Sequence, residues 1–111
     1  MKLEVVTYNE LIGFHCWPDA PEEVAFLRYP HRHRFEIRCW FEVNHEDREL
    51  EIFLTERKIN DYLLKKYGDE NGELWLDSTS CETLGKQIIV TFGCLACQVL
   101  EDGKGGAIVR R

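Results

Sequence analysis

Alternation of apolar and polar side chains marks residues 31–43 of the chain. Successive side chains of a strand point to opposite faces, so this period of two predicts a half-buried β-strand. The apolar face of this strand consists of His33, Phe35, Ile37, Cys39, Phe41 and Val43. The polar face consists of Arg34, Glu36, Arg38 and Glu42. The apolar face of this predicted strand, which should turn away from water, therefore begins with histidine.

Two further extended segments flank this strand. Residues 2–8 have strand composition, and we expect the strand to continue toward Phe14. The stretch 17–23 predicts a loop, because its two prolines cannot take part in a hydrogen-bonded ladder. After a turn that contains a solvated His45, alternation in 48–54 predicts a short returning strand.

Two amphipathic helices follow. We expect Thr55 to cap the first helix and Gly68 to end it. Thr79 and Glu82 have capping-box spacing at the start of the second helix, where Glu82 has a structural role, and Gly93 ends it. The apolar stripes are Ile59, Tyr62, Leu63 and Tyr67 on the first helix, and Cys81, Leu84, Ile88 and Phe92 on the second.

A last hairpin is predicted at the end of the chain. Residues 95–101 and 107–110 have strand composition and flank the glycine-rich stretch 102–106. The resulting order, β-β-α-α-β-β with a short extra strand in 48–54, predicts an α+β domain over residues 1–111. We expect an antiparallel four-stranded sheet with two helices packed on one face.

Composition narrows the classes of function. The 111 residues carry a formal net charge of −6, and acidic residues are spread along the chain. No basic stripe is available to neutralise phosphates, so we expect no binding to nucleic acid. No apolar run approaches the roughly 20 residues that span a bilayer, and the first residues lack a secretion signal. We therefore expect a cytoplasmic protein without a membrane segment.

The cysteines agree with a reducing compartment. They are five in number and show no regular framework, so they predict free thiols. The C-x-x-C spacing of 94–97 lies at the predicted start of a strand, and no second pair exists for a zinc ribbon. Buried thiols are the better interpretation of this pair.

The histidines are the strongest candidate for chemistry. His31 and His33 are two residues apart, so a strand would point both imidazoles the same way. His15 ends the preceding strand, which can pair alongside and bring a third imidazole. Three neutral imidazoles leave one position of a tetrahedral zinc ion open, as in catalytic zinc sites. The alternative is that His31 and His33 are half-exposed residues at the end of a strand.

Three segments carry a resemblance to a known family. The segment 14–43, "FHCWPDAPEEVAFLRYPHRHRFEIRCWFEV", has a histidine at the end of one strand and H-x-H at the start of the next. The segment 78–88, "STSCETLGKQI", is similar to a helix start with the pattern P-T-x-E-N-L-A, and 97–102, "CQVLED", resembles a V-x-V-x-E-T strand. In this order they resemble the 6-pyruvoyltetrahydropterin synthase and 6-carboxytetrahydropterin synthase family over nearly the whole chain.

The resemblance implies a fold, a metal and a reaction. It implies the tunnelling fold, in which several subunits build a barrel, and hence a homo-oligomer. It implies a Zn²⁺ ion held by His15, His31 and His33, and a pterin ring anchored by Glu101. The implied activity is a carbon–oxygen lyase that acts on dihydroneopterin triphosphate or a related compound. A carboxylate suits the anchoring role, because it accepts two parallel N–H bonds from a guanidine-like ring edge.

The chain also departs from the family. Leu27 stands where the synthases carry a proton-handling cysteine, and Arg32 replaces the glycine between the histidines, as a bulky cation close to the expected metal. The family's aspartate–histidine pair is missing. Alternation would turn Cys16 to the opposite face, and Cys81 lies in the first turn of a helix, where the dipole would lower a thiol pKa. Cys81 is more simply a small core residue, so the catalytic residue stays unknown.

Two other functions stay open at the level of sequence. One is a diverged member that binds a pterin or purine-like molecule without converting it, which Leu27 and the missing histidine favour. The other is a structural zinc-binding subunit of a larger assembly.

Overall fold

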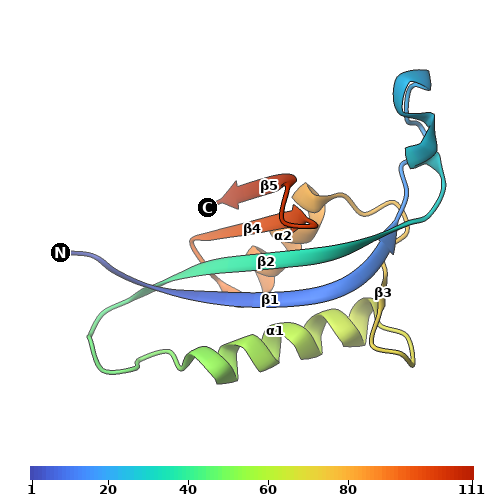
Figure 1. Cartoon of the computed structure of the whole chain (residues 1–111). Coiled ribbons are helices and arrows are strands. Elements are labelled where there is room, and N and C mark those ends of the chain that lie inside the picture. Colours follow the sequence, from blue (N-terminus) through green and yellow to red (C-terminus); the bar gives the residue numbers. More distant parts are fainter.

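A five-stranded mixed sheet carries two α-helices on one of its faces (Figure 1). The structure is a computed structural model that describes all 111 residues. In chain order the elements are β1 (Leu3–His15), the 3-10 helix η1 (Glu22–Arg28), β2 (His31–Val43), α1 (Ile52–Tyr67), β3 (Leu74–Trp75), α2 (Cys81–Phe92), β4 (Ala96–Glu101) and β5 (Gly105–Arg110). None of the helices combines the length and the apolar character that crossing a bilayer requires.

The long strands β1 and β2 form the centre of the sheet. The strand order is β3-β1-β2-β4-β5, and β1 pairs antiparallel with β2 along its full length. β4 pairs antiparallel with β2 and with β5, whereas β3 runs parallel to the end of β1. The register sets His15 opposite His31 and Gly13 opposite His33, so the ends of the two strands bring the histidines to one place.

The core lies between the sheet and the two α-helices. The alternating face of β2 is buried as predicted, and Phe35, Ile37 and Cys39 are fully inaccessible. These side chains pack with Ile59 and Leu63 of α1, and with residues of α2, β4 and β5. All five cysteines are free, and the C-x-x-C pair at 94–97 is buried in this core, which confirms the interpretation as buried thiols.

Local signals explain the ends of both helices. Ser80 caps α2 by accepting the backbone N–H of Thr83, one residue later than the predicted Thr79. Gly93 ends α2 in the left-handed conformation, and Gly68 ends α1, both as predicted.

The prediction of four antiparallel strands and two helices is wrong in detail. The returning strand predicted in 48–54 does not form: α1 begins there, and Glu51 rather than Thr55 caps it by accepting the N–H groups of Phe53 and Leu54. β1 and β4 already occupy both edges of β2, so a strand returning from its end has no free edge to pair with. The fifth strand is the two-residue β3, whose parallel pairing with β1 the sequence did not signal.

The segment between β1 and β2 projects from the body of the protein (Figure 1). It contains the 3-10 helix η1, which begins at the end of the loop predicted for 17–23 and which the sequence did not signal. Phe26 and Tyr29 are each 72% exposed on this projection.

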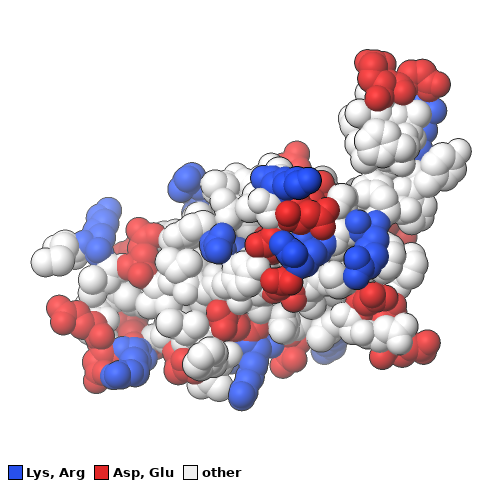
Figure 2. Space-filling model, viewed as in Figure 1, with Lys and Arg blue, Asp and Glu red and all other residues white.

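The face of the sheet opposite the helices is not covered by any element of the chain. Acidic and basic side chains are interspersed over the face seen in Figure 2. Arg34 pairs with Glu10 and Glu36, and the Tyr8 hydroxyl donates to the same two carboxylates.

Candidate metal site

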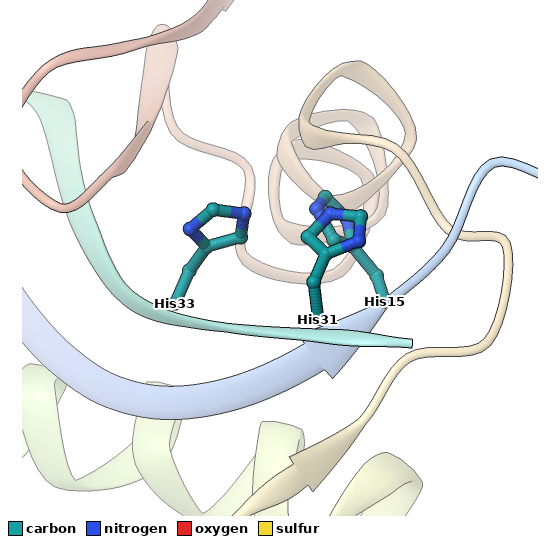
Figure 3. Close-up of side chains that lie close together, drawn as sticks. All are labelled: His15, His31 and His33. Carbon is teal, nitrogen blue, oxygen red and sulfur yellow. The ribbon is translucent and has the colours of Figure 1, made fainter. Parts of the chain in front are cut away.

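Three imidazoles converge at the end of the β1–β2 pair. One ring nitrogen from each of His15, His31 and His33 lies within 4.8 Å of the others. Figure 3 shows the three rings on the side of the strands that faces α2. The convergence predicted from strand spacing is confirmed.

In each ring the outer nitrogen, Nδ1, forms a hydrogen bond with an acceptor outside the group of three histidines. Nδ1 of His15 lies 3.1 Å from the carbonyl oxygen of Thr79, and Nδ1 of His31 lies 2.9 Å from that of Tyr29. Nδ1 of His33 lies 2.7 Å from Oδ2 of Asp102. Carbonyl and carboxylate oxygens only accept, so all three Nδ1 atoms carry hydrogen and donate. Such outer contacts fix the ring orientation and tautomer of metal-binding histidines.

The inner nitrogens are therefore the free ligand atoms. A neutral imidazole with hydrogen on Nδ1 keeps a lone pair on Nε2. Nε2 of His33 is buried and has no hydrogen-bond partner, a costly state unless another group satisfies it. Burial lowers the pKa of His15, which favours the neutral form that binds metal ions.

This donor set fits zinc. Three neutral imidazoles are a common protein ligand set for zinc with a catalytic role. Tetrahedral zinc with bonds of about 2.0 Å holds its ligand atoms about 3.3 Å apart. The three rings can reach that spacing by closing in by about 1.5 Å at most, from the limit of 4.8 Å.

Glu101 lies against the imidazoles. Its Oε2 is 2.9 Å from Nε2 of His15, and its Oε1 is 3.7 Å from Nε2 of His33. Glu101 ends β4 opposite Phe35 of β2, so its side chain shares the buried face with His33. The sequence predicted a ring anchor at this position; the carboxylate is close enough to the histidines to belong to their site.

Asp102 is a residue of the site that the sequence analysis missed. Its Oδ1 accepts the backbone N–H of Arg34, while Oδ2 accepts from His33. These two donors lower the pKa of Asp102 and keep the carboxylate ionised. The residue has φ of 56°, a left-handed conformation that aspartate tolerates better than most residues. The only sequence signal at Asp102 was the glycine-rich stretch 102–106, which follows a predicted strand.

A cavity of about 460 Å³ opens beside the three rings. This volume falls within the range of small-molecule sites. Its lining residues are His15, Cys16, Trp17, Leu27, His31, Ser78, Thr79, Ser80, Cys81, Glu82, Glu101 and Gly106. The start of α2, the end of β1 and the projecting segment thus share one cavity with two of the three histidines.

Cys16 lies just past the stretch to which alternation applies. Alternation was expected to turn this thiol away from the site, but β1 ends at His15 and the period of two ends with it. The backbone N–H of Cys16 instead donates to the carbonyl of Asp77, and the residue lines the cavity. Leu27, at the family's cysteine position, lines the same cavity.

Cys81 and Arg32 also differ from what their positions suggested. Cys81 is buried, and its thiol lies 3.6 Å from Oε2 of Glu101. Burial and the charge of Glu101 raise the pKa of Cys81 to about 12, so the helix dipole does not produce a thiolate there. Arg32 is exposed and points to the opposite face from its two histidine neighbours, so its charge does not crowd the site.

No family model matches the chain, and no curated protein matches it at a significant level.

Proposed function

We propose that this chain is a zinc-dependent lyase of the pterin class that acts on dihydroneopterin triphosphate or a related compound. The observation that carries the proposal is the set of three Nε2 atoms left free by outward hydrogen bonds, beside a cavity of about 460 Å³. The resemblance to the 6-pyruvoyltetrahydropterin and 6-carboxytetrahydropterin synthases supplies the substrate class.

The chain's own groups have separable roles in this proposal. Bound zinc would supply a Lewis acid that polarises the side-chain oxygens of the substrate. The carboxylate of Glu101 would accept N–H groups of the pterin ring and so orient it. Trp17 and Leu27 line the cavity and would limit access of water.

Elimination also requires a group that moves a proton. In the family this group is a cysteine at the position of Leu27, which cannot exchange a proton. Cys16 is a half-buried cysteine that lines the cavity and is the sequence neighbour of His15, so we assign it as the candidate proton carrier. The thiol of Cys81 is a weaker candidate, because its raised pKa keeps it protonated.

The test is incubation of the zinc-loaded protein with dihydroneopterin triphosphate, followed by chromatography with mass detection. We expect loss of substrate with the wild type and none with His31→Ala. Cys16→Ser should keep its zinc and lower turnover by about 100-fold or more, since general acid–base groups contribute on that scale. A wild-type protein that holds zinc but leaves the substrate unchanged would overturn the assignment as a lyase.

The chain lacks the proton carriers of the synthase family, and this absence favours a second function. Leu27 and the lack of the family's aspartate–histidine pair suit a protein that binds a pterin or purine-like molecule without converting it. Binding of dihydroneopterin by the zinc-loaded protein without turnover would support this function. Zinc binding without any affinity for the ring would support a structural zinc subunit.

We also propose a cytoplasmic homo-oligomer. Five free cysteines suit a reducing compartment. The outer edge of β5 has no partner strand, and apolar side chains such as Val6 and Ile108 are exposed on the uncovered face. Unpaired strand edges invite pairing with another chain.

A further inference from the structure

The position of Glu101 raises a problem of charge. Nδ1 of His15 donates to the carbonyl of Thr79, so a neutral His15 turns its Nε2 lone pair inward. At 2.9 Å from that atom lies Oε2 of Glu101, an acceptor as well. Nε2 of His33, also with a lone pair, lies 3.7 Å from the other carboxylate oxygen. Lone pairs and an anion at these distances repel one another unless a proton or a metal ion lies between them.

The distances suit a cation coordinated by all of these groups. In a tetrahedral zinc site with bonds of about 2.0 to 2.1 Å, a nitrogen and an oxygen ligand lie about 3.3 Å apart. The two nitrogen–oxygen distances, 2.9 and 3.7 Å, fall on either side of this value. Glu101 belongs to β4, which pairs with β2 on the side away from β1. It therefore approaches the three histidines from a side that no histidine occupies.

We propose that Glu101 is the fourth ligand of the metal in the ligand-free protein, and that an incoming pterin ring draws it away. This inference rests on the proposed function and deepens it. The carboxylate closes the position that three histidines leave open. When the N–H groups of a ring edge reach Glu101, the carboxylate turns to accept them, and the metal position opens for the substrate side chain. The site thus exposes its reactive position only when the ring is in place.

The test uses cobalt(II) as a spectroscopic substitute for zinc and azide as a small anion that takes an open metal position. The variants are Glu101→Gln and Glu101→Asp, with Glu82→Gln as the matched control. Glu82 is an acidic residue of the same cavity without a contact to the imidazoles. Circular dichroism of the metal-free proteins checks that each variant is folded, and Glu101→Asp retains the charge if Glu101→Gln fails to fold.

We expect Glu101→Gln to bind cobalt(II) at least about tenfold more weakly and azide at least about tenfold more tightly than the wild type. Its visible spectrum should change, whereas Glu82→Gln should match the wild type. Addition of 7,8-dihydropterin, which has the ring edge but no side chain to take the metal position, should raise the azide affinity of the wild type toward that of Glu101→Gln.

Three failures are distinguishable. If the wild type binds no metal, or if His31→Ala binds it equally well, the proposed function fails. If His31→Ala loses the metal but both Glu101 variants match the wild type in spectrum and azide affinity, only the role of Glu101 is overturned. An azide affinity that does not rise on addition of 7,8-dihydropterin overturns the release of Glu101 by the ring.

Discussion

At the scale of single residues, the candidate metal site depends on groups that face away from the metal. His33 is held by Asp102, whereas His15 and His31 donate to backbone carbonyls. The outer partner of His33 is therefore the only one of the three that a substitution can remove. The anionic partner also makes this imidazole a stronger base toward a metal ion.

We predict that Asp102→Asn weakens zinc affinity by about 10- to 100-fold, the usual effect of losing an outer partner. Asparagine tolerates the left-handed backbone at this position, so the turn should survive. Competition with a chromophoric chelator measures the affinity. Unchanged affinity in Asp102→Asn would mean that the carboxylate does not support His33.

A second prediction for a single residue concerns Tyr8, which lies on the other face of the sheet. Burial, together with the carboxylates of Glu10 and Glu36 that accept from its hydroxyl, raises the pKa of Tyr8 from 10.0 to about 12. The fold therefore favours the neutral phenol. This contribution to stability is complete below pH 10 and is lost as the pH rises from 10 to 12.

Urea unfolding at pH 9 and at pH 11 measures the free energy of unfolding and tests whether it falls as the pH rises. The wild type should lose more stability between the two values than Tyr8→Phe. Tyr29→Phe, which changes an exposed tyrosine, is the control and should behave like the wild type. An equal loss in Tyr8→Phe and the wild type would show that Tyr8 is not the group responsible.

At the scale of elements, the ends of α2 show how local signals define a helix. Ser80 accepts an N–H group at the start, and Gly93 adopts φ of 73° at the end. A Cβ atom on Gly93 would meet no other atom within 4 Å, so only the backbone conformation requires glycine there. The start of α2 lines the cavity, so these signals also position part of the site.

We predict that Gly93→Ala lowers the free energy of unfolding by about 1 kcal/mol, because alanine is strained in the left-handed conformation. Gly105→Ala is the matched control: its Cβ atom also meets nothing, and its φ is not in the left-handed region. Urea unfolding of both variants measures the difference. Equal stability of the two would contradict the assigned cause.

The sequence predicted those features that depend on neighbouring residues, and it missed those that depend on contacts elsewhere in the fold. Three predictions are confirmed: the period of two in β2, the glycine ends of both α-helices, and the pairing of the strand that ends at His15 with the strand that holds His31 and His33. β3 and the start of α1 were missed, because they depend on which sheet edges are already occupied. Asp102 was missed and Cys16 was set aside, because each lies just past the end of a strand, where alternation no longer predicts direction.

At the scale of the whole molecule, the uncovered face of the sheet bears on assembly. Ala107 and Val109 of β5 pack against the core, so Ile108 between them points to the uncovered face, where it is 46% exposed. β5 is also the edge of the sheet. A second copy would cover both the edge and the face, as the proposed homo-oligomer requires.

We predict an oligomer for the wild type by light scattering, and dissociation toward monomer in Ile108→Lys, because burial of an unpaired charge at an interface is costly. Val90→Lys changes an exposed apolar residue of α2 and should leave the assembly intact. A wild type that is monomeric at all concentrations would contradict the proposed assembly.

The convergence of three imidazoles on one divalent ion is the central claim, and the zinc content of the purified protein tests it most directly. Elemental analysis by mass spectrometry should find about one zinc ion per chain in the wild type and in His45→Ala, which removes an exposed histidine of a turn. It should find almost none in His31→Ala. A wild type without zinc that also fails to take it up, or a His31→Ala variant that keeps it, would contradict the claim.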